Sequence, residues 1–197
     1  MELDVSQRKE YIILHAIDLI DQNGIHNVST KEIAKRINVS EGMIFKLYPK
    51  KSDLILAVLN HFSFYDRDMF YSAFERHEDA LEAIRFYINS YMIYYENYPA
   101  ITAVYQVYDT LKGDEILEQK AKDIHFSRID YLRKLIVKAK ENGFVSDTID
   151  AEDIATIISS IVRGLCLKWR LSKYNFSLKE KVISATNLVL EAIRIQI

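Results

Sequence analysis

Apolar residues recur every three or four positions along almost the whole chain, a spacing that predicts α-helices rather than strands. In the segment SQRKEYIILHAIDLIDQNG, one helical face carries Ile12, Ile13, Ala16 and Ile17, and Gly24 marks the end of that helix. The chain has only 5 glycines and 2 prolines, so few positions favour turns and a fold of many strands is disfavoured.

The same pattern predicts further helices joined by short connections. Two short helices lie within VSTKEIAKRI and EGMIFKLY. Longer helices are predicted over residues 52–76, 78–98, 99–111, 112–143, 150–173 and 177–197. The predicted fold class is therefore all-α, with about nine helices and no sheet.

Residues 29–48 contain the start and stop signals of the two short helices. Ser29 followed by Glu32 has the spacing of a capping box, in which each side chain bonds a backbone N–H of the first turn. Asn38 tolerates the left-handed backbone angles of a tight turn, and Ser40 is placed to cap the second helix. This order predicts a helix-turn-helix, whose second helix enters the major groove of DNA.

Residues 30–51 carry an excess of positive charge. The chain has 26 Lys and Arg against 28 Asp and Glu, a net charge of -2, yet residues 30–51 hold six cations and two acids. A charge run is usually a solvated helix surface, and that interpretation stays open for the cations alone. Beside a helix-turn-helix, however, the cations predict a surface for the phosphates of DNA.

The stretch TKEIAKRINVSEGMIFKLYPKKSDLILAVL resembles the DNA-binding region of the TetR family of bacterial transcriptional regulators. The positions that match the family pattern are Ile33, Ala34, Val39, Ser40, Gly42, Lys51 and Leu54, and Thr30 stands one residue closer to them than the pattern has its threonine. Three positions depart from it: Asn38 replaces a glycine, Phe45 a tyrosine and Tyr48 a phenylalanine. The family's tyrosine commonly bonds a phosphate through its hydroxyl, which Phe45 lacks.

The resemblance implies a helix-turn-helix DNA-binding domain over residues 1–52 and a helical effector-binding and dimerisation domain over residues 53–197. It implies phosphate contacts for Thr30 and Lys51, and base contacts such as Lys46 to guanine or Glu41 to cytosine. The full set of implied DNA-binding residues is Thr30, Ser40, Glu41, Gly42, Met43, Phe45, Lys46, Leu47, Tyr48 and Lys51. Tyr48 either contacts a phosphate or places its hydroxyl at the surface.

Many of the 13 tyrosines and 9 phenylalanines lie between residues 62 and 108. They can form an aromatic core, or they can line a cavity for an apolar or aromatic small molecule whose orientation the phenol groups fix. The resemblance favours the cavity and names no effector. The predicted ligand-binding residues are Phe62, Tyr65, Tyr87, Tyr91, Tyr105, Tyr108 and Phe126.

The last two predicted helices offer more apolar surface than two neighbours in a monomer need. We predict that they pair with their copies across a two-fold axis as a four-helix interface, although burial within one subunit is the alternative. The predicted interface residues are Ile157, Ile161, Gly164, Leu165, Leu188 and Ala192.

Other classes of function find little support in the sequence. Cys166 is the only cysteine, none of the five histidines form an i, i+4 pair, and no glycine-rich phosphate loop is present. We expect no catalysis, no cofactor and no metal site. The N-terminus is polar and no stretch of eighteen apolar residues occurs, so we expect a cytoplasmic protein without membrane contact.

The leading hypothesis is a homodimeric, ligand-responsive transcriptional regulator, most simply a repressor that a small molecule releases from a palindromic operator on double-stranded DNA. The alternative is a helical small-molecule-binding or interaction protein without DNA binding. Glu41 and Phe45 motivate that alternative, because one repels phosphate and the other lacks a hydroxyl. An activator that binds DNA in the same way stays equally open.

Overall fold

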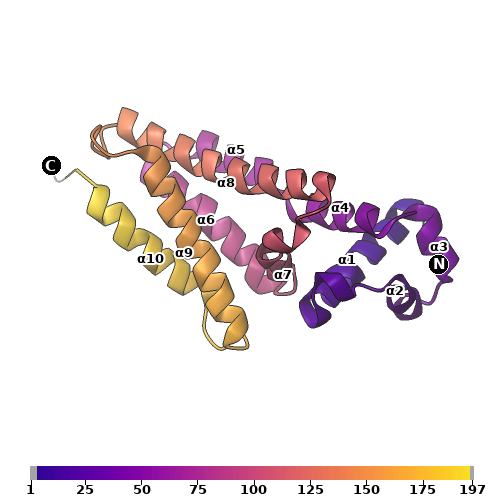
Figure 1. Cartoon of the computed structure of the whole chain (residues 1–197). Coiled ribbons are helices and arrows are strands. Elements are labelled where there is room, and N and C mark those ends of the chain that lie inside the picture. Colours follow the sequence, from indigo (N-terminus) through magenta and orange to yellow (C-terminus); the bar gives the residue numbers. More distant parts are fainter. Residues whose placement is uncertain (1–3, 196–197) are drawn as a thin grey trace. The chain divides into compact units, whose positions relative to one another are not determined.

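The computed structural model describes residues 4–195, which fold into helices throughout (Figure 1). Within this range no strand forms, and a single antiparallel bridge joins Val145 to Arg194. The α-helices are α1 (Val5–Asn23), α2 (Thr30–Arg36), α3 (Glu41–Leu47), α4 (Lys51–Phe62), α5 (Asp66–Arg76), α6 (Ala80–Asn97), α7 (Ile101–Gln106), α8 (Glu115–Glu141), α9 (Ala151–Leu171) and α10 (Leu178–Ile193). Two 3-10 helices, η1 (Ile25–Asn27) and η2 (Tyr108–Leu111), lie between them. The predicted all-α class is confirmed.

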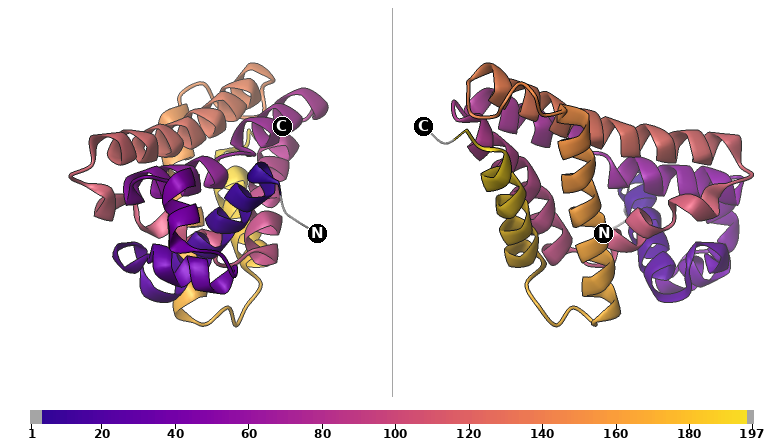
Figure 2. Two further views of the ribbon diagram at one scale, coloured as in Figure 1. Left: turned by 90° about the vertical axis from the view of Figure 1, so that its right-hand side faces the viewer. Right: turned by 60° about the vertical axis from the view of Figure 1, so that its left-hand side comes forward.

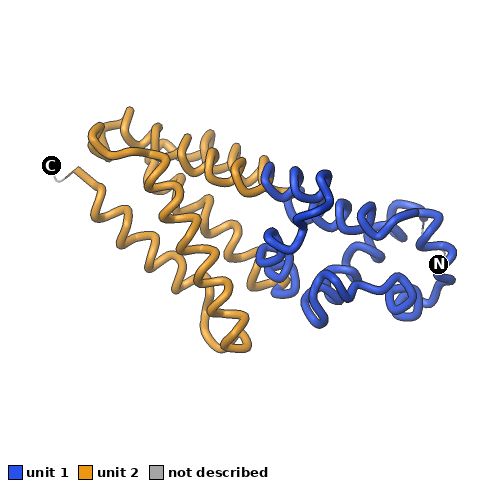
Figure 3. Tube along the Cα trace, in the orientation of Figure 1, with its two compact units in different colours: residues 1–64, 99–123 blue, residues 65–98, 124–197 orange. Residues whose placement is uncertain are grey.

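The chain divides into two compact units (Figure 3). The first contains the residues up to Phe64 together with Pro99–Asp123, and the second contains Tyr65–Tyr98 and the residues from Ile124 onward. Helix α8 contributes its first residues to one unit and the rest to the other. The predicted domain boundary between residues 52 and 53 concerns function, and as a functional division it stays a prediction.

Helix α1 supplies the centre of the first unit. Its inward face is fully or almost fully buried and packs against α2, α4 and α7. Asp4 caps the helix, accepting from the backbone N–H of Gln7 at 2.8 Å while the Gln7 side chain accepts from Asp4 N–H at 3.1 Å. Gly24 ends the helix at a φ of 79°, which a side chain would disfavour.

The second unit is built around α6, which packs against α5 and α10, while α10 also packs against α9 (Figure 2). Tyr87 and Tyr95 of α6 are among the largest fully buried side chains of the protein. On α9, Trp169 is buried and its indole N–H donates to the carbonyl of Phe176 at 2.8 Å. The same helix buries Cys166 completely.

The segment 52–76, predicted as one helix, forms two, α4 and α5. At the end of α4 the backbone N–H of Ser63 donates to the carbonyl of Leu59 at 3.2 Å, and the Ser63 hydroxyl donates to the same carbonyl at 3.1 Å. Asp66 then begins α5, and its carboxylate binds a residue 62 positions later in the chain. A partner so distant leaves no trace in the local apolar pattern, and for that reason the break was not predicted.

That distant partner is Arg128 on α8. Its guanidinium donates to both carboxylate oxygens of Asp66, at 2.7 and 2.8 Å, and to the Tyr95 hydroxyl at 3.1 Å. The guanidinium also lies 4.8 Å from the ring centroid of Tyr91. Both charged side chains are buried. A bidentate Arg–Asp pair fixes the relative orientation of the two side chains as well as their distance. Together with the bond to Tyr95, it therefore holds α5, α6 and α8 in one arrangement.

We expect Asp66→Asn to lower the free energy of unfolding of the second unit by about 3–5 kcal/mol, because Arg128 would keep a buried charge without its counter-ion. Denaturant unfolding followed by the fluorescence of Trp169, the chain's one tryptophan, measures this loss. Asp130→Asn is the matched control, since Asp130 pairs with Arg133 and Lys134 at the surface and should contribute less than about 1 kcal/mol. Equal losses in the two variants would contradict the assigned role of the buried pair.

Candidate nucleic-acid interface

Helices α2 and α3 pack against each other and are joined by residues 37–40. The Ser29 hydroxyl accepts from the N–H of Glu32, and the Ser40 hydroxyl accepts from the N–H of Met43, each at 3.3 Å. Asn38 has a φ of 55°, the left-handed conformation that the sequence predicted for this turn. The described backbone and side chains therefore form a helix-turn-helix.

The predicted capping box at α2 forms only in part. The Ser29 half is present, but the Glu32 carboxylate pairs with Arg36 at 3.2 Å instead of accepting from the backbone of Ser29. Arg36 also donates to the side chain of Gln22 at 2.9 Å. This pairing ties α2 to α1 and satisfies Glu32 in another way.

The inward and outward faces of the two helices differ sharply. Ile33, Ala34 and Ile44 are buried, as the sequence predicted. Gly42 and Lys46 are exposed on α3, and Phe45 exposes 47% of its surface. Glu41, Met43 and Leu47 are half-buried, and Ser40 is exposed at the cap. The solvent-facing side of α3 therefore offers Gly42, Phe45 and Lys46.

Two side chains with implied phosphate contacts have partners inside the protein. The Thr30 hydroxyl donates to Oε1 of Glu41 at 2.7 Å, which links the first residue of α2 to the first residue of α3. The ammonium of Lys51 donates to the carbonyl of His26 at 2.6 Å and so links α4 to η1. Neither bond has a signal in the local sequence, because the partners are 11 and 25 residues apart.

The side chain of Tyr48 is mostly buried, while its phosphate contact and its surface hydroxyl both stay predictions. It ends α3 and exposes only 7% of its surface, and burial raises the pKa of its hydroxyl. The residue packs as a core aromatic, like the phenylalanine that it replaces in the family pattern. Its implied phosphate contact stays a prediction that this burial does not favour.

All six cations of residues 30–51 are exposed. They are Lys31, Lys35, Arg36, Lys46, Lys50 and Lys51. Only two acids, Glu32 and Glu41, lie in the same stretch, so its net charge is +4. An exposed surface with this excess attracts a polyanion and releases counter-ions from it on binding.

The seven predicted ligand-binding aromatics fall into both units. In the first unit the Phe62 and Tyr105 ring centroids lie 6.0 Å apart, and Tyr105 and Tyr108 meet edge-on at 6.0 Å. In the second unit the Tyr87 and Tyr91 hydroxyls are 3.3 Å apart. Their burial raises the pKa of both phenols, so both stay protonated at neutral pH.

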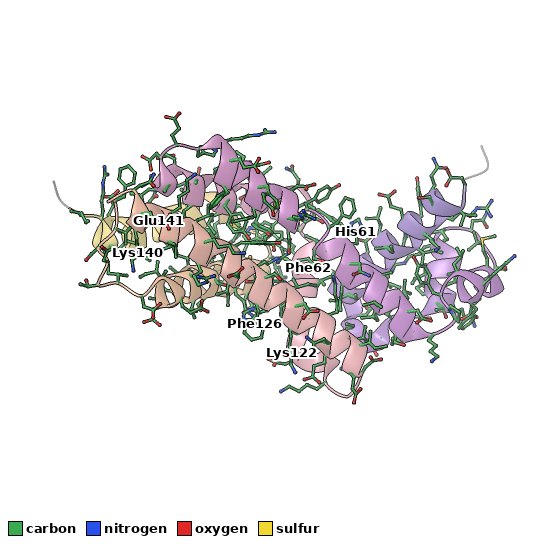
Figure 4. All side chains as sticks on the ribbon, turned by 90° about the horizontal axis from the view of Figure 1, so that it is seen from above. His61, Phe62, Lys122, Phe126, Lys140 and Glu141 are labelled. Carbon is green, nitrogen blue, oxygen red and sulfur yellow. The ribbon has the colours of Figure 1, made fainter. Side chains whose placement is uncertain are left out.

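The other two predicted ligand residues lie near the surface. Tyr65 meets Tyr94 edge-on at 6.1 Å, and the pKa of Tyr94 is raised to about 12, mainly by burial. Phe126, marked on α8 in Figure 4, exposes 62% of its surface. None of the seven lines the depression of about 690 Å³ beside Leu56 and Ile116, or the one of about 400 Å³ beside Phe86 and Ile183. Their role as a ligand site stays a prediction.

The outer face of α9 and α10 is apolar and exposed. Of the predicted interface residues, Ile157, Gly164, Leu188 and Ala192 are exposed, and Ile161 and Leu165 are half-buried. Leu188 exposes 73% of its surface.

Sequence reasoning missed two further residues of this face, Leu167 and Leu171, of which Leu171 exposes 76%. Both continue the helical spacing of Ile157 and Gly164 along α9, a signal that could have found them.

Residues 4–195 lack two kinds of feature. No group of three or more His, Cys, Asp and Glu side chains lies in an arrangement that could hold a metal ion. No helix in that part of the chain combines the length and the apolar character needed to cross a membrane.

Comparison with known proteins decides the relationship that the motif suggested. Residues 12–58 match the family described as bacterial regulatory proteins, tetR family. Over these residues the chain is a TetR family sequence. The matched segment contains α2 and α3 in full, the part of α1 from Ile12 onward and the part of α4 up to Val58. The helix-turn-helix therefore lies inside the segment that the family shares.

Several relatives and solved structures are similar to this protein over most of its length. A transcriptional regulator of the TetR family from Agrobacterium tumefaciens is 19% identical with a TM-score of 0.82, over 98% of this chain and 100% of that one. FadR from Bacillus subtilis in complex with stearoyl-CoA is 19% identical with a TM-score of 0.81, over 93% and 98%. Nucleoid occlusion factor SlmA from Vibrio atlanticus is 20% identical over 87% of this chain and 88% of its own length. At these identities, the structural matches establish the fold.

The turn of this TetR family protein offers a test of its backbone geometry. We expect Asn38→Ala to destabilise α2 and α3 by about 1 kcal/mol, because alanine resists the left-handed conformation more than asparagine does. Asn38→Gly should change stability by less, since glycine accepts that conformation but gains freedom in the unfolded chain. Amide hydrogen exchange within α2 and α3 measures both. A larger loss for glycine than for alanine would show that the positive φ is not the constraint.

Proposed function

We propose that this TetR family protein is a homodimeric, ligand-responsive repressor that acts by binding a palindromic operator on double-stranded DNA. The observation that carries the proposal is the exposed, cationic helix-turn-helix: α3 presents Gly42, Phe45 and Lys46 to solvent within a stretch of net charge +4. Because the target is bacterial DNA, the site of action is the cytoplasm. The protein regulates and does not catalyse.

The helix-turn-helix geometry suits the major groove. A recognition helix uses exposed side chains for base edges, while neighbouring residues hold the phosphates. Lys46 can donate to O6 and N7 of guanine, and the missing side chain at Gly42 allows the backbone to approach closely. Three further predicted DNA-binding residues lie beside these positions: Ser40 just before α3, and Met43 and Leu47 on it.

We expect DNA binding to weaken steeply as salt rises from roughly 50 to 200 mM, because bound counter-ions are released from the phosphates. Lys46→Ala should lower affinity for a selected operator by roughly tenfold or more. Lys112→Ala removes an exposed cation of the same unit outside the helix-turn-helix and should leave affinity within about twofold. Gel-shift titration with genomic fragments measures both. Binding that ignores salt, or equal losses in both variants, would refute DNA recognition and favour a helical ligand carrier.

In a dimer, each half-site of the operator would bind one recognition helix. The exposed apolar face of α9 and α10, with Leu171 and Leu188 most exposed, supports pairing of these helices across a two-fold axis. The small residues Gly164 and Ala192 on that face would let the partner helices approach closely. The dimer would then place two recognition helices on half-sites about 10 base pairs or more apart.

We expect Leu188→Glu to convert the protein to a monomer, since a carboxylate would have to lose its water inside the interface. Light scattering after size-exclusion chromatography measures the mass. Ile116→Glu places the same charge on an apolar residue of α8 that is nearly as exposed, at 66% against 73%, and should leave the dimer intact. A dimeric Leu188→Glu protein would exclude this face as the interface.

The effector in this proposal is a small apolar or aromatic molecule. The buried phenols of Tyr87 and Tyr91, together with Arg128, offer hydrogen bonds and ring faces within the second unit. The fold neighbour FadR from Bacillus subtilis, seen with stearoyl-CoA, gives a precedent for a ligand with a long apolar chain in this fold. A ligand that weakens DNA binding must itself bind more weakly to the DNA complex, by the same factor.

A further inference from the structure

The link between Thr30 and Glu41 has a consequence for operator sequence. The two residues begin α2 and α3, and the Thr30 hydroxyl donates to Oε1 of Glu41 at 2.7 Å. Such a short bond to a carboxylate is of the stronger, charge-assisted kind. Glu41 is half-buried, and its Oε2 has no hydrogen-bond partner among residues 4–195. One oxygen is therefore held and the other is available as an acceptor.

A carboxylate on a DNA-binding surface is selective because most of DNA repels it. Phosphates are anionic, and guanine and thymine present acceptor oxygens in the major groove. The exocyclic amino groups of cytosine and adenine are the base-edge donors there, and carboxylates pair best with N4 of cytosine. An acid beside six exposed cations thus lowers general affinity and can raise affinity only where it meets an amino group.

The selectivity of Glu41 depends on its orientation, which Thr30 restricts. A free glutamate side chain samples many rotamers and can turn away from the groove, so it discriminates poorly between bases. The bond from Thr30 restricts Glu41 to one orientation before DNA arrives, and preorganised acceptors lose less on binding. In this state the Thr30 hydroxyl proton is engaged by Glu41, which argues against Thr30 as a simple phosphate donor.

Resting on the DNA-binding function proposed above, we propose that Glu41 is a specificity-determining residue that selects cytosine at one position of each operator half-site, and that Thr30 is its positioning residue. The inference replaces the phosphate contact that the family resemblance implies for Thr30. For Glu41 it keeps the cytosine contact that the resemblance implies and adds the bond that holds the carboxylate in place.

The test is selection of bound duplexes from a randomised double-stranded DNA pool by the full-length protein, followed by sequencing. Wild type should enrich a palindrome with one required cytosine in each half. Glu41→Gln should shift that position toward adenine, because a carboxamide pairs with adenine N6 and N7, with a change in the cytosine-to-adenine ratio on the order of 10- to 100-fold. Glu141→Gln, the same loss of charge at an exposed position of α8, should leave every position unchanged.

Thr30 variants separate positioning from phosphate contact. Thr30→Val keeps the shape but removes the donor, and should weaken the cytosine preference several-fold at that position alone; Thr30→Ser should restore it. If Thr30→Val instead lowers affinity for all duplexes equally, Thr30 contacts phosphate and the positioning role is wrong. An unchanged preference in Glu41→Gln overturns the inference while leaving DNA regulation intact. A wild-type protein that enriches no sequence overturns the proposed function itself.

Discussion

Two helices of seven residues each depend on tertiary packing, because isolated helices of that length are unstable in water. The side chains that hold them are Ile33, Ala34 and Ile44, all buried. Helix α2 packs against α1 and α3 packs against α2, so the long first helix stabilises the surface that we propose for DNA binding. Everything proposed about DNA recognition depends on this small apolar contact, since without it the outward face of α3 would have no fixed geometry.

The second unit contains a buried pair of opposite charges. Arg128 and Asp66 satisfy each other with two bonds, and Tyr95 and Tyr91 complete the surroundings of the guanidinium. Buried polar groups of this kind stabilise a structure mainly when every member has its partner, so the cluster favours one helix arrangement over close alternatives. A regulator needs such discrete arrangements, because a continuously deformable core would transmit no defined signal.

The sequence predicted features whose cause is local. The turn at Asn38, the cap at Ser40 and the inward face of α2 all follow from residues within a few positions of one another, and the structure has each of them. Features that join distant residues were missed or misjudged: the break before Asp66, the partners of Thr30 and Lys51, and the burial of Tyr48. Composition showed that aromatics are abundant but not which unit each would join, so the ligand residues were the least predictable part of the site.

The buried position of Cys166 makes the molecule convenient for chemical labelling. Burial raises the pKa of its thiol to about 12, so almost no thiolate exists at neutral pH, and the side chain has no exposed surface for a reagent to reach. Maleimides and mild oxidants should therefore not modify Cys166 while the protein is folded. A cysteine introduced at any exposed position would be the sole reactive thiol, and a spectroscopic probe attached there would report on that position without background.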